Sequence, residues 1–266
     1  MVIKDLINKS VYGTIGYIGS QQDIDTLEQY IIYNKTVLDE FKNIIVATNF
    51  KELNFLLMDT YTQMWKRYFK DCVIINSEIN RGHNHGCADL DNLVIDYCKE
   101  NNINWLFKSA NDTIFLESFL TNEIEDVDFY YLNGIGVGGM VQYNFDFDRI
   151  IKEDFYPQTN FYIINVDKID YLNDKSYLNE TYNYIQSIRD YNGRIWEYIK
   201  NWSCEDFLKN CITRNNLSKH HLIPLNKYHI LLQHVKDNTI HDCSHKNVLI
   251  EGVCHLHYKD QPMLSI

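Results

Sequence analysis

The segment "NIIVATN", residues 43–49, decides the fold class because four apolar residues follow one another in it without alternation. A strand with one face in water alternates apolar and polar side chains, whereas a strand covered on both faces does not. Short apolar runs of the same kind recur at residues 14–19, 72–76, 104–110 and 128–133. We therefore predict an α/β fold with a mostly parallel sheet flanked by helices.

Segments with helical spacing separate these strands. The first helix is expected behind Asp23 as its cap, from apolar residues that recur on one helical face: Ile24, Leu27, Ile31 and Leu38. Further helices are expected over residues 53–65 and 90–97. The alternation stops near Gly139, so we predict one domain, residues 1–266, with a regular half at 1–139 and an irregular half at 140–266.

Composition limits the class of protein. A formal charge of −11 over 266 residues makes general binding to nucleic-acid backbones unfavourable. The 7 cysteines form no CxxC pair, which favours reduced thiols in a cytoplasmic protein. The sequence has no 18-residue apolar run and no signal peptide pattern, so we expect a soluble chain without a transmembrane segment. Abundant Asn, Ile, Lys and Tyr are typical of low-GC bacterial or viral genomes.

Polar residues gather where the predicted strands end. In parallel α/β sheets, ligands bind beyond the carboxyl ends of the strands. Four pairs of residues stand at these ends: Gly19 and Ser20, Thr48 and Asn49, Arg81 and Gly82, and Asn111 and Asp112. The sequence therefore predicts a ligand site at this edge of the sheet.

The stretch "NRGHNHGCADLDN", residues 80–92, is the most unusual of these ends. Arg81 could pair with a phosphate or carboxylate. The glycines of the stretch, Gly82 and Gly86, would let a ligand come close to the backbone. The spacing matches neither a Walker loop nor GxGxxG. His83 and His85 could bind a metal, but histidines two apart in a turn are more often only polar. We expect this stretch to line a ligand.

Two acidic positions could carry chemistry. Asp112 ends a predicted strand and could hold Mg²⁺ or Mn²⁺, or it could simply cap the next helix. In "NWSCEDFLKNC", residues 201–211, a helix is expected to begin near Glu205 with Ser203 as N-cap. Asp206 then either completes a capping arrangement or acts as a general base.

The C-terminal stretch "HDCSHKNVLIEGVCHLHYKD", residues 241–260, is dense in histidine and cysteine. The spacing lacks the usual ligand gaps of structural zinc sites, so a closed zinc site is disfavoured. A strand over "VCHLHY" would put His255 and His257 on one face, from which one of them could join Asp112 at a metal.

Together these segments resemble the nucleotide-sugar glycosyltransferases of the GT-A fold, especially the inverting family 2 type. The glycine-ended first strand, "NRGHNHGCADLDN", "WLFKSANDTIF" and "CEDF" occur in the family's order. The last three of these segments are similar, in that order, to the family's asparagine-x-glycine loop, its DxD strand and the Glu-Asp pair of its acceptor-side helix. The family's DxD acids would fall at Ser109 and Asn111, so Asp112 alone keeps a carboxylate.

The resemblance implies an inverting transfer from a nucleoside-diphosphate sugar, most often a UDP-hexose, to a hydroxyl of a glycan or another acceptor. Residues 1–139 would then bind the donor, and residues 140–266 the acceptor. Asp206 would be the base. Asp112 with His255 or His257 would hold Mn²⁺ or Mg²⁺. The remaining implied ligand contacts are Thr48, Asn49, Arg81, Gly82, Asp89, Asn111 and Glu205.

Two other hypotheses stay open from the sequence. The degenerate DxD favours a non-catalytic module that binds a nucleotide sugar or a glycan. The C-terminal histidines and cysteines favour a zinc-bearing protein that modifies nucleic acid, and a sugar transferase acting on modified bases would combine this with the first hypothesis.

Overall fold

The computed structural model describes residues 1–50, 54–110, 113–115, 117–121, 123–133, 155, 157–188, 204–222, 248–250 and 253–255. His255 has a described backbone, whereas Asn111, Asp112, Ser203 and His257 lie outside the described residues. Among the helices within this part of the chain, none is both long and apolar enough to cross a bilayer.

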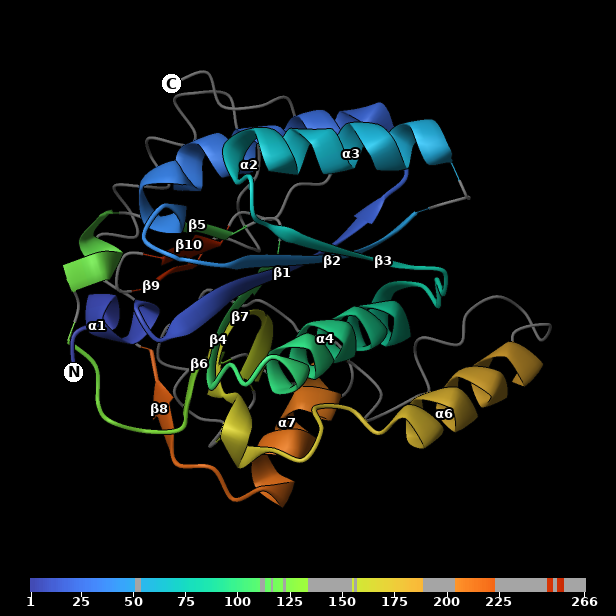
Figure 1. Cartoon of the computed structure of the whole chain (residues 1–266). Coiled ribbons are helices and arrows are strands. Elements are labelled where there is room, and N and C mark those ends of the chain that lie inside the picture. Colours follow the sequence, from blue (N-terminus) through green and yellow to red (C-terminus); the bar gives the residue numbers. More distant parts are fainter. Residues whose placement is uncertain are drawn as a thin grey trace.

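A seven-stranded sheet with the order β3-β2-β1-β4-β7-β6-β8 forms the centre of the molecule (Figure 1). All its neighbouring pairs are parallel except the two made by β7, so the mostly parallel sheet is confirmed. Its strands are β1 Ser10–Ile18, β2 Ile44–Phe50, β3 Val73–Ser77, β4 Trp105–Ala110, β6 Phe129–Asn133, β7 Pro157–Asn165 and β8 Lys219–His221. The strands β7 and β8, from the half expected to be irregular, thus complete the same sheet.

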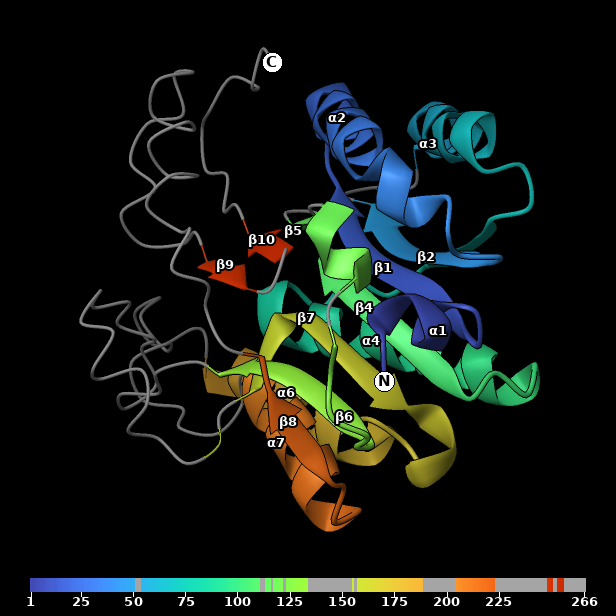
Figure 2. The same cartoon turned by 90° about the vertical axis from the view of Figure 1, so that its left-hand side faces the viewer.

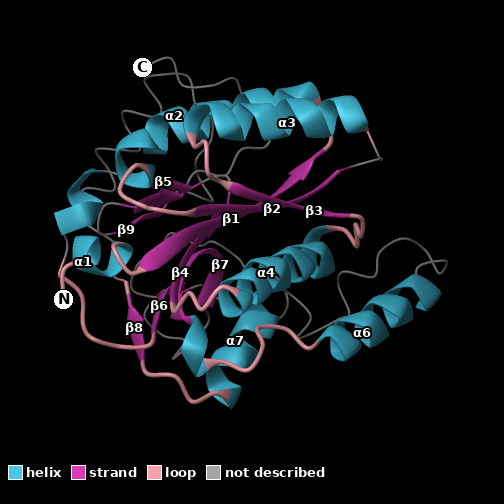
Figure 3. Cartoon of the chain, in the orientation of Figure 1, coloured by secondary structure: helices cyan, strands magenta, loops and turns pink. Residues whose placement is uncertain are grey.

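Helices cover both faces of this sheet (Figures 1 and 3). One side carries α2 and α3, and the other carries α4 and α7, with α6 packed against α4. The bounds are α1 Ile3–Ile7, α2 Gln21–Leu38, α3 Phe55–Tyr68, α4 His83–Glu100, α6 Lys175–Ile188 and α7 Cys204–Arg214, with short 3₁₀ helices η1 Glu117–Thr121 and η2 Val166–Lys168. The α/β class with flanking helices is therefore also confirmed.

A small antiparallel sheet lies beside the large one (Figure 2). It consists of β5 Thr113–Phe115, β10 Val253–His255 and β9 Val248–Ile250, in that order. The backbone N–H of Phe115 donates to the side chain of Asn34 on α2, at 2.8 Å, which ties β5 to the helix layer. The pairing of β10 with β5 places a C-terminal strand beside the segment that follows β4.

Alternation along β2 explains why this strand reads as continuously apolar. Ile44 and Val46 belong to the core cluster shared with α2 and α3. Ile45 and Ala47 belong to the cluster shared with α4 and α7. Because successive side chains point to opposite faces and helices cover both faces, the four consecutive residues from Ile44 to Ala47 are all apolar.

Two helix starts differ from the expectation. Ser20, not Asp23, is the N-cap of α2, since its hydroxyl accepts the N–H of Asp23 at 3.3 Å. The Asp23 carboxylate in turn accepts the N–H of Gly19, the residue before the N-cap, at 2.8 Å, an arrangement close to a capping box. Helix α4 begins at His83, so most of the stretch at residues 80–92 is helical and only its first residues form the turn.

Gly82 makes this early helix start feasible. It is the N-cap of α4 with φ 81° and ψ −162°, a region that residues with a side chain rarely occupy. Gly86 lies one turn later inside the helix, where an added Cβ would meet neighbouring atoms only at ordinary contact distances of 3.7 Å or more. The two glycines therefore have different roles.

We predict that Gly82→Ala destabilises the protein whereas Gly86→Ala does not. Gly82→Ala should lower the free energy of unfolding by about 1–3 kcal/mol, because alanine is strained in this backbone region although there is open space around it. Gly86→Ala should leave it unchanged or raise it by up to about 1 kcal/mol through helix propensity. Urea unfolding of both variants measures this, and losses of equal size would contradict it.

Candidate functional site

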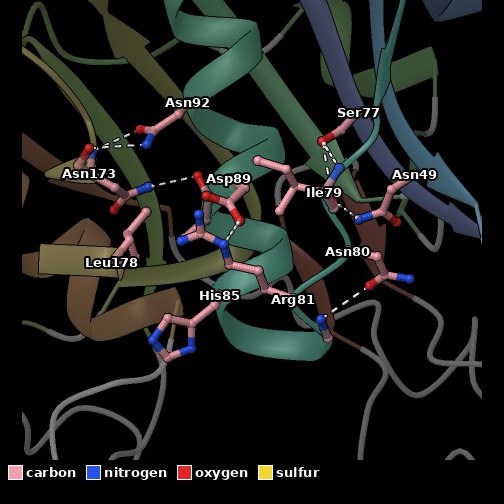
Figure 4. Close-up of polar contacts among 12 residues, drawn as sticks. Asn49, Ser77, Ile79, Asn80, Arg81, His85, Asp89, Asn92, Asn173 and Leu178 are labelled. Carbon is pink, nitrogen blue, oxygen red and sulfur yellow. Dashed lines mark hydrogen bonds and ion pairs between the residues drawn. The ribbon is translucent and has the colours of Figure 1, made fainter. Parts of the chain in front are cut away.

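The loops after β1, β2, β3 and β4 meet at one edge of the sheet because these strands are parallel neighbours. We call this edge the carboxyl edge. The segment of residues 78–82 crosses it between β3 and α4 (Figure 4). The strand β7 runs in the opposite direction, so its first residues lie at the same edge. The predicted ligand site thus corresponds to a physical meeting point of several elements.

Arg81 is the strongest candidate for binding an anion. Its Nε lies 3.3 Å from Asp89 Oδ2, and its guanidinium lies 5.4 Å from the ring centroid of Tyr182 on α6. Its Nη1 is buried and has no hydrogen-bond partner among the described residues. Burial raises the pKa of Asp89, while the Arg81 cation acts in the opposite direction. One side of the guanidinium is therefore fixed in place and the other still has N–H groups to donate.

Thr48 and Asn49 lie near the end of β2 but differ in what they offer to a ligand. The hydroxyl of Thr48 is fully buried and donates to the carbonyl of Gly16 at 2.9 Å, which stabilises the β1–β2 pairing. The amide of Asn49 donates to the carbonyl of Ile79 at 3.4 Å, which holds the loop before α4 (Figure 4). Asn49 Oδ1 has no partner among the described residues, so it retains an acceptor.

His85 connects the start of α4 to two other helices. Its Nε2 lies 2.8 Å from the hydroxyl of Thr181 on α6, and its ring lies 5.6 Å from that of Phe207 on α7. Burial lowers the pKa of His85, and the charge of Arg81 adds to this, which favours the neutral ring. The described residues contain no group of three His, Cys, Asp or Glu side chains arranged to hold a metal.

The acidic pair Glu205–Asp206 lies in the first turn of α7, and both side chains are half-buried. The hydroxyl of Thr159 donates to Glu205 Oε1 at 3.0 Å, and the thiol of Cys204 donates to Oε2 at 3.3 Å. Thr159 lies on β7 two residues before Phe161, which pairs with Ser109 near the end of β4. The pair therefore lies at the carboxyl edge, and the contact of Phe207 with His85 places it beside the start of α4.

Sequence reasoning missed a buried ion pair beneath this edge. Lys108 on β4 is 1% exposed, and its Nζ lies 3.3 Å from Asp91 Oδ1 on α4. Lys108 also donates to the carbonyl of Thr159 and lies 5.5 Å from the ring centroid of Tyr162. Burial raises the pKa of Asp91 to about 6, and the Lys108 cation limits that rise. A lysine inside the apolar run "WLFKSA" was the signal that could have revealed the pair.

Of the expected metal ligands, the structure describes only the backbone of His255. Asn111, Asp112 and His257 lie outside the described residues. Thr113, the neighbour of Asp112 in sequence, pairs with His255 in the β5–β10 register. Ser109, at the first position of the expected DxD, is buried and hydrogen-bonded to the hydroxyl of Tyr12. The metal site therefore stays a prediction that rests on Asp112 and the C-terminal histidines.

No protein-family model and no curated protein sequence matches the chain. Among solved structures, core-mannan synthase A from Aspergillus fumigatus, in a manganese and GDP form, is similar over 77% of this chain and 69% of its own, with 7% identity and a TM-score of 0.47. The galactosyltransferase LgtC, in complex with donor and acceptor sugar analogues, is similar over 92% and 86%, with 8% identity and a TM-score of 0.46.

A nucleoside-diphosphate-sugar pyrophosphorylase from Vibrio cholerae is similar over 79% of this chain and 90% of its own, with 13% identity and a TM-score of 0.40. The names of all three proteins refer to sugar transfer, glycan synthesis or nucleotide sugars. All three TM-scores lie below 0.5, so the functional assignment rests on the residues of the carboxyl edge.

We predict strong coupling between Lys108 and Asp91. Lys108→Met should destabilise the protein by about 3–5 kcal/mol, because it leaves a buried carboxylate without its cation. Adding Asp91→Asn should recover much of that loss. Urea unfolding of the single and double variants measures the coupling, and strictly additive losses would contradict it.

The same pair predicts a pH dependence. The folded-state pKa of Asp91 exceeds its unfolded value, so the folded state binds this proton more tightly and stability falls as the pH rises from about 4 to 6. In Lys108→Met the pKa should rise further, so its loss of stability should be smaller at pH 5 than at pH 8. An equal loss at both values would show that Asp91 does not control the effect.

Proposed function

We propose that the protein is a glycosyltransferase that moves a hexose from a UDP-sugar to a hydroxyl acceptor, with inversion at the anomeric carbon. The observation that carries this proposal is the arrangement at the carboxyl edge. A half-buried arginine whose Nη1 has no partner among the described residues lies just before α4, beside an acid pair that opens α7. The first fits a departing diphosphate and the second fits a general base.

Arg81 would bind the diphosphate of the donor. The developing negative charge of the leaving group is stabilised best by a cation that is already fixed in place and poorly hydrated. The contacts of Arg81 with Asp89 and Tyr182 supply that fixation. Gly82, which has no Cβ, would permit a phosphate to approach the first N–H groups of α4.

Asp206 would remove the proton of the acceptor hydroxyl as its oxygen attacks the anomeric carbon. Attack from the face opposite the leaving diphosphate breaks the glycosidic bond in a single displacement and inverts the configuration. Glu205 would contact the acceptor or hold this turn in place. Asn49, Asp89 and Asn111 would contact the nucleoside, whereas the full burial of Thr48 leaves it a supporting role in the strand pairing.

A divalent ion would be held by Asp112 with His255 or His257. When bound, it would supply additional positive charge at the diphosphate. The pairing of Thr113 with His255 supports this set, and carboxylate with imidazole suits Mn²⁺ better than Mg²⁺. We also propose a cytoplasmic setting, in line with the free thiols of Cys72, Cys87, Cys98, Cys204 and Cys211.

A second candidate function is binding of a nucleotide sugar without turnover. The burial of Ser109 against Tyr12 favours it, because this position of the expected DxD cannot serve a metal. Under this alternative Arg81 would still bind the diphosphate, while the acid pair would be structural. Calorimetry with UDP, together with turnover assays on the same sample, separates the two functions.

The catalytic proposal predicts that Asp206→Asn lowers kcat for transfer from a UDP-sugar with Mn²⁺ by about a hundredfold or more, because general base catalysis contributes that much. Donor affinity should be retained, as measured by calorimetry. Asp59→Asn is the matched control, since Asp59 is exposed on α3 across the sheet. Turnover of Asp206→Asn near that of the control would show that the base is another group.

The donor proposal predicts that Arg81→Gln weakens UDP binding about tenfold or more, since it removes charge-assisted hydrogen bonds to the diphosphate. Affinity for uridine, which lacks phosphate, should change much less. Arg67→Gln, which removes an exposed arginine paired with Glu28, is the control. Equal losses for UDP and uridine would place Arg81 away from the diphosphate.

A further inference from the structure

The ion pair of Lys108 and Asp91 is connected through Thr159 to Glu205, the first residue of the acid pair of α7. Lys108 contributes its charge from β4, and Asp91 meets it from α4 at 3.3 Å. The same ammonium donates to the carbonyl of Thr159 on β7. Three elements that surround the carboxyl edge are therefore joined at one nitrogen atom, inside a core whose other members are largely apolar.

Thr159 continues this connection from its other side. Its carbonyl accepts from Lys108, while its hydroxyl donates to Glu205 Oε1 at 3.0 Å. The thiol of Cys204 donates to the second carboxylate oxygen at 3.3 Å. A hydrogen bond with Cys87, together with burial, raises the pKa of Cys204, which keeps this thiol protonated as a donor. Both oxygens of Glu205 thus have a partner.

Structure alone does not require such an arrangement at this point. A glutamate in the first turn of a helix is stabilised by the helix dipole without any specific partner. Burying a lysine in a strand is costly unless it is paired, and an apolar residue would pack here at a lower cost. Orientation of a carboxylate at a reacting centre does require fixed partners on each oxygen, because a small misplacement costs much rate.

We propose that Lys108 and Thr159 are positioning residues, which hold the Glu205 carboxylate, and through it the turn that carries Asp206, in place at the end of β4. This inference rests on the proposed transferase function. Lys108 fixes the backbone of Thr159, Thr159 fixes Glu205, and Asp91 balances the charge of Lys108. Neither Lys108 nor Thr159 contacts a substrate in this account.

The test uses two substitutions of similar shape at Thr159. Thr159→Val keeps the β-branched shape and the carbonyl that binds Lys108, but it removes the hydroxyl that donates to Glu205. Thr159→Ser keeps that hydroxyl. Thr159→Val should lower kcat about tenfold to a hundredfold at nearly unchanged donor KM, whereas Thr159→Ser should remain within a few-fold of wild type.

An independent readout is the carboxyl ¹³C resonance of Glu205 in protein labelled at the glutamate side-chain carbon, identified by its loss in Glu205→Gln. Thr159→Val should shift this resonance and Thr159→Ser should leave it near the wild-type position. Circular dichroism and thermal unfolding of both variants show whether they fold, and Thr159→Ala, which also lacks the hydroxyl, takes the place of Thr159→Val if that variant does not fold.

The two readouts separate failure of this inference from failure of the proposed function. An unshifted Glu205 resonance in Thr159→Val overturns the positioning role whether or not the protein turns over a nucleotide sugar. A shifted resonance with wild-type kcat also overturns it, because Glu205 would then be held without consequence for transfer. A shifted resonance in a protein without any turnover supports the positioning and counts against the transferase function.

Discussion

The parallel pairing of β1 with both β2 and β4 is the constraint on which the rest of the structure depends. Because these strands run in one direction, the segments that follow them must leave the sheet at a single edge. Helices then return over both faces, which explains why the strands are apolar at nearly every position. The reversed strand β7 brings Thr159 to the same edge, where the start of α7 meets it.

The distribution of charge follows from this arrangement. The chain carries a formal charge of −11, yet two cations lie beside this edge, Lys108 fully buried and Arg81 half-buried. Each is paired with a carboxylate of α4, and this attraction offsets the unfavourable free energy of removing the cation from water. Arg81 keeps donors free of protein partners among the described residues, whereas Lys108 is directed to Asp91 and Thr159. Arg81 is therefore suited to bind a ligand, and Lys108 is suited to support the protein around the ligand site.

The strands of the first half could be predicted from the sequence because burial on both faces leaves an unbroken apolar run. The start of α4 could not, since its first turn contains glycine and histidine and its N-cap is a glycine without a side chain to signal it. The strand β7 was not singled out because it begins with Pro, Gln, Thr and Asn, so its apolar run starts only at Phe161. Arg81 and the acid pair were chosen from their positions at strand and helix ends, whereas the role of Lys108 depends on tertiary contacts to Asp91 and Thr159.

The central claim is that one site at the carboxyl edge holds a nucleoside diphosphate and its divalent ion. Paramagnetic broadening of backbone amide resonances by Mn²⁺, recorded with UDP present, tests it most directly. The account predicts that amides of Gly82, Ala110 and Cys204 to Asp206 broaden first, while those of α1 and of the last turn of α3, at the opposite edge of the sheet, remain sharp. Broadening confined to other parts of the chain, or none at all when UDP is bound, would contradict the account.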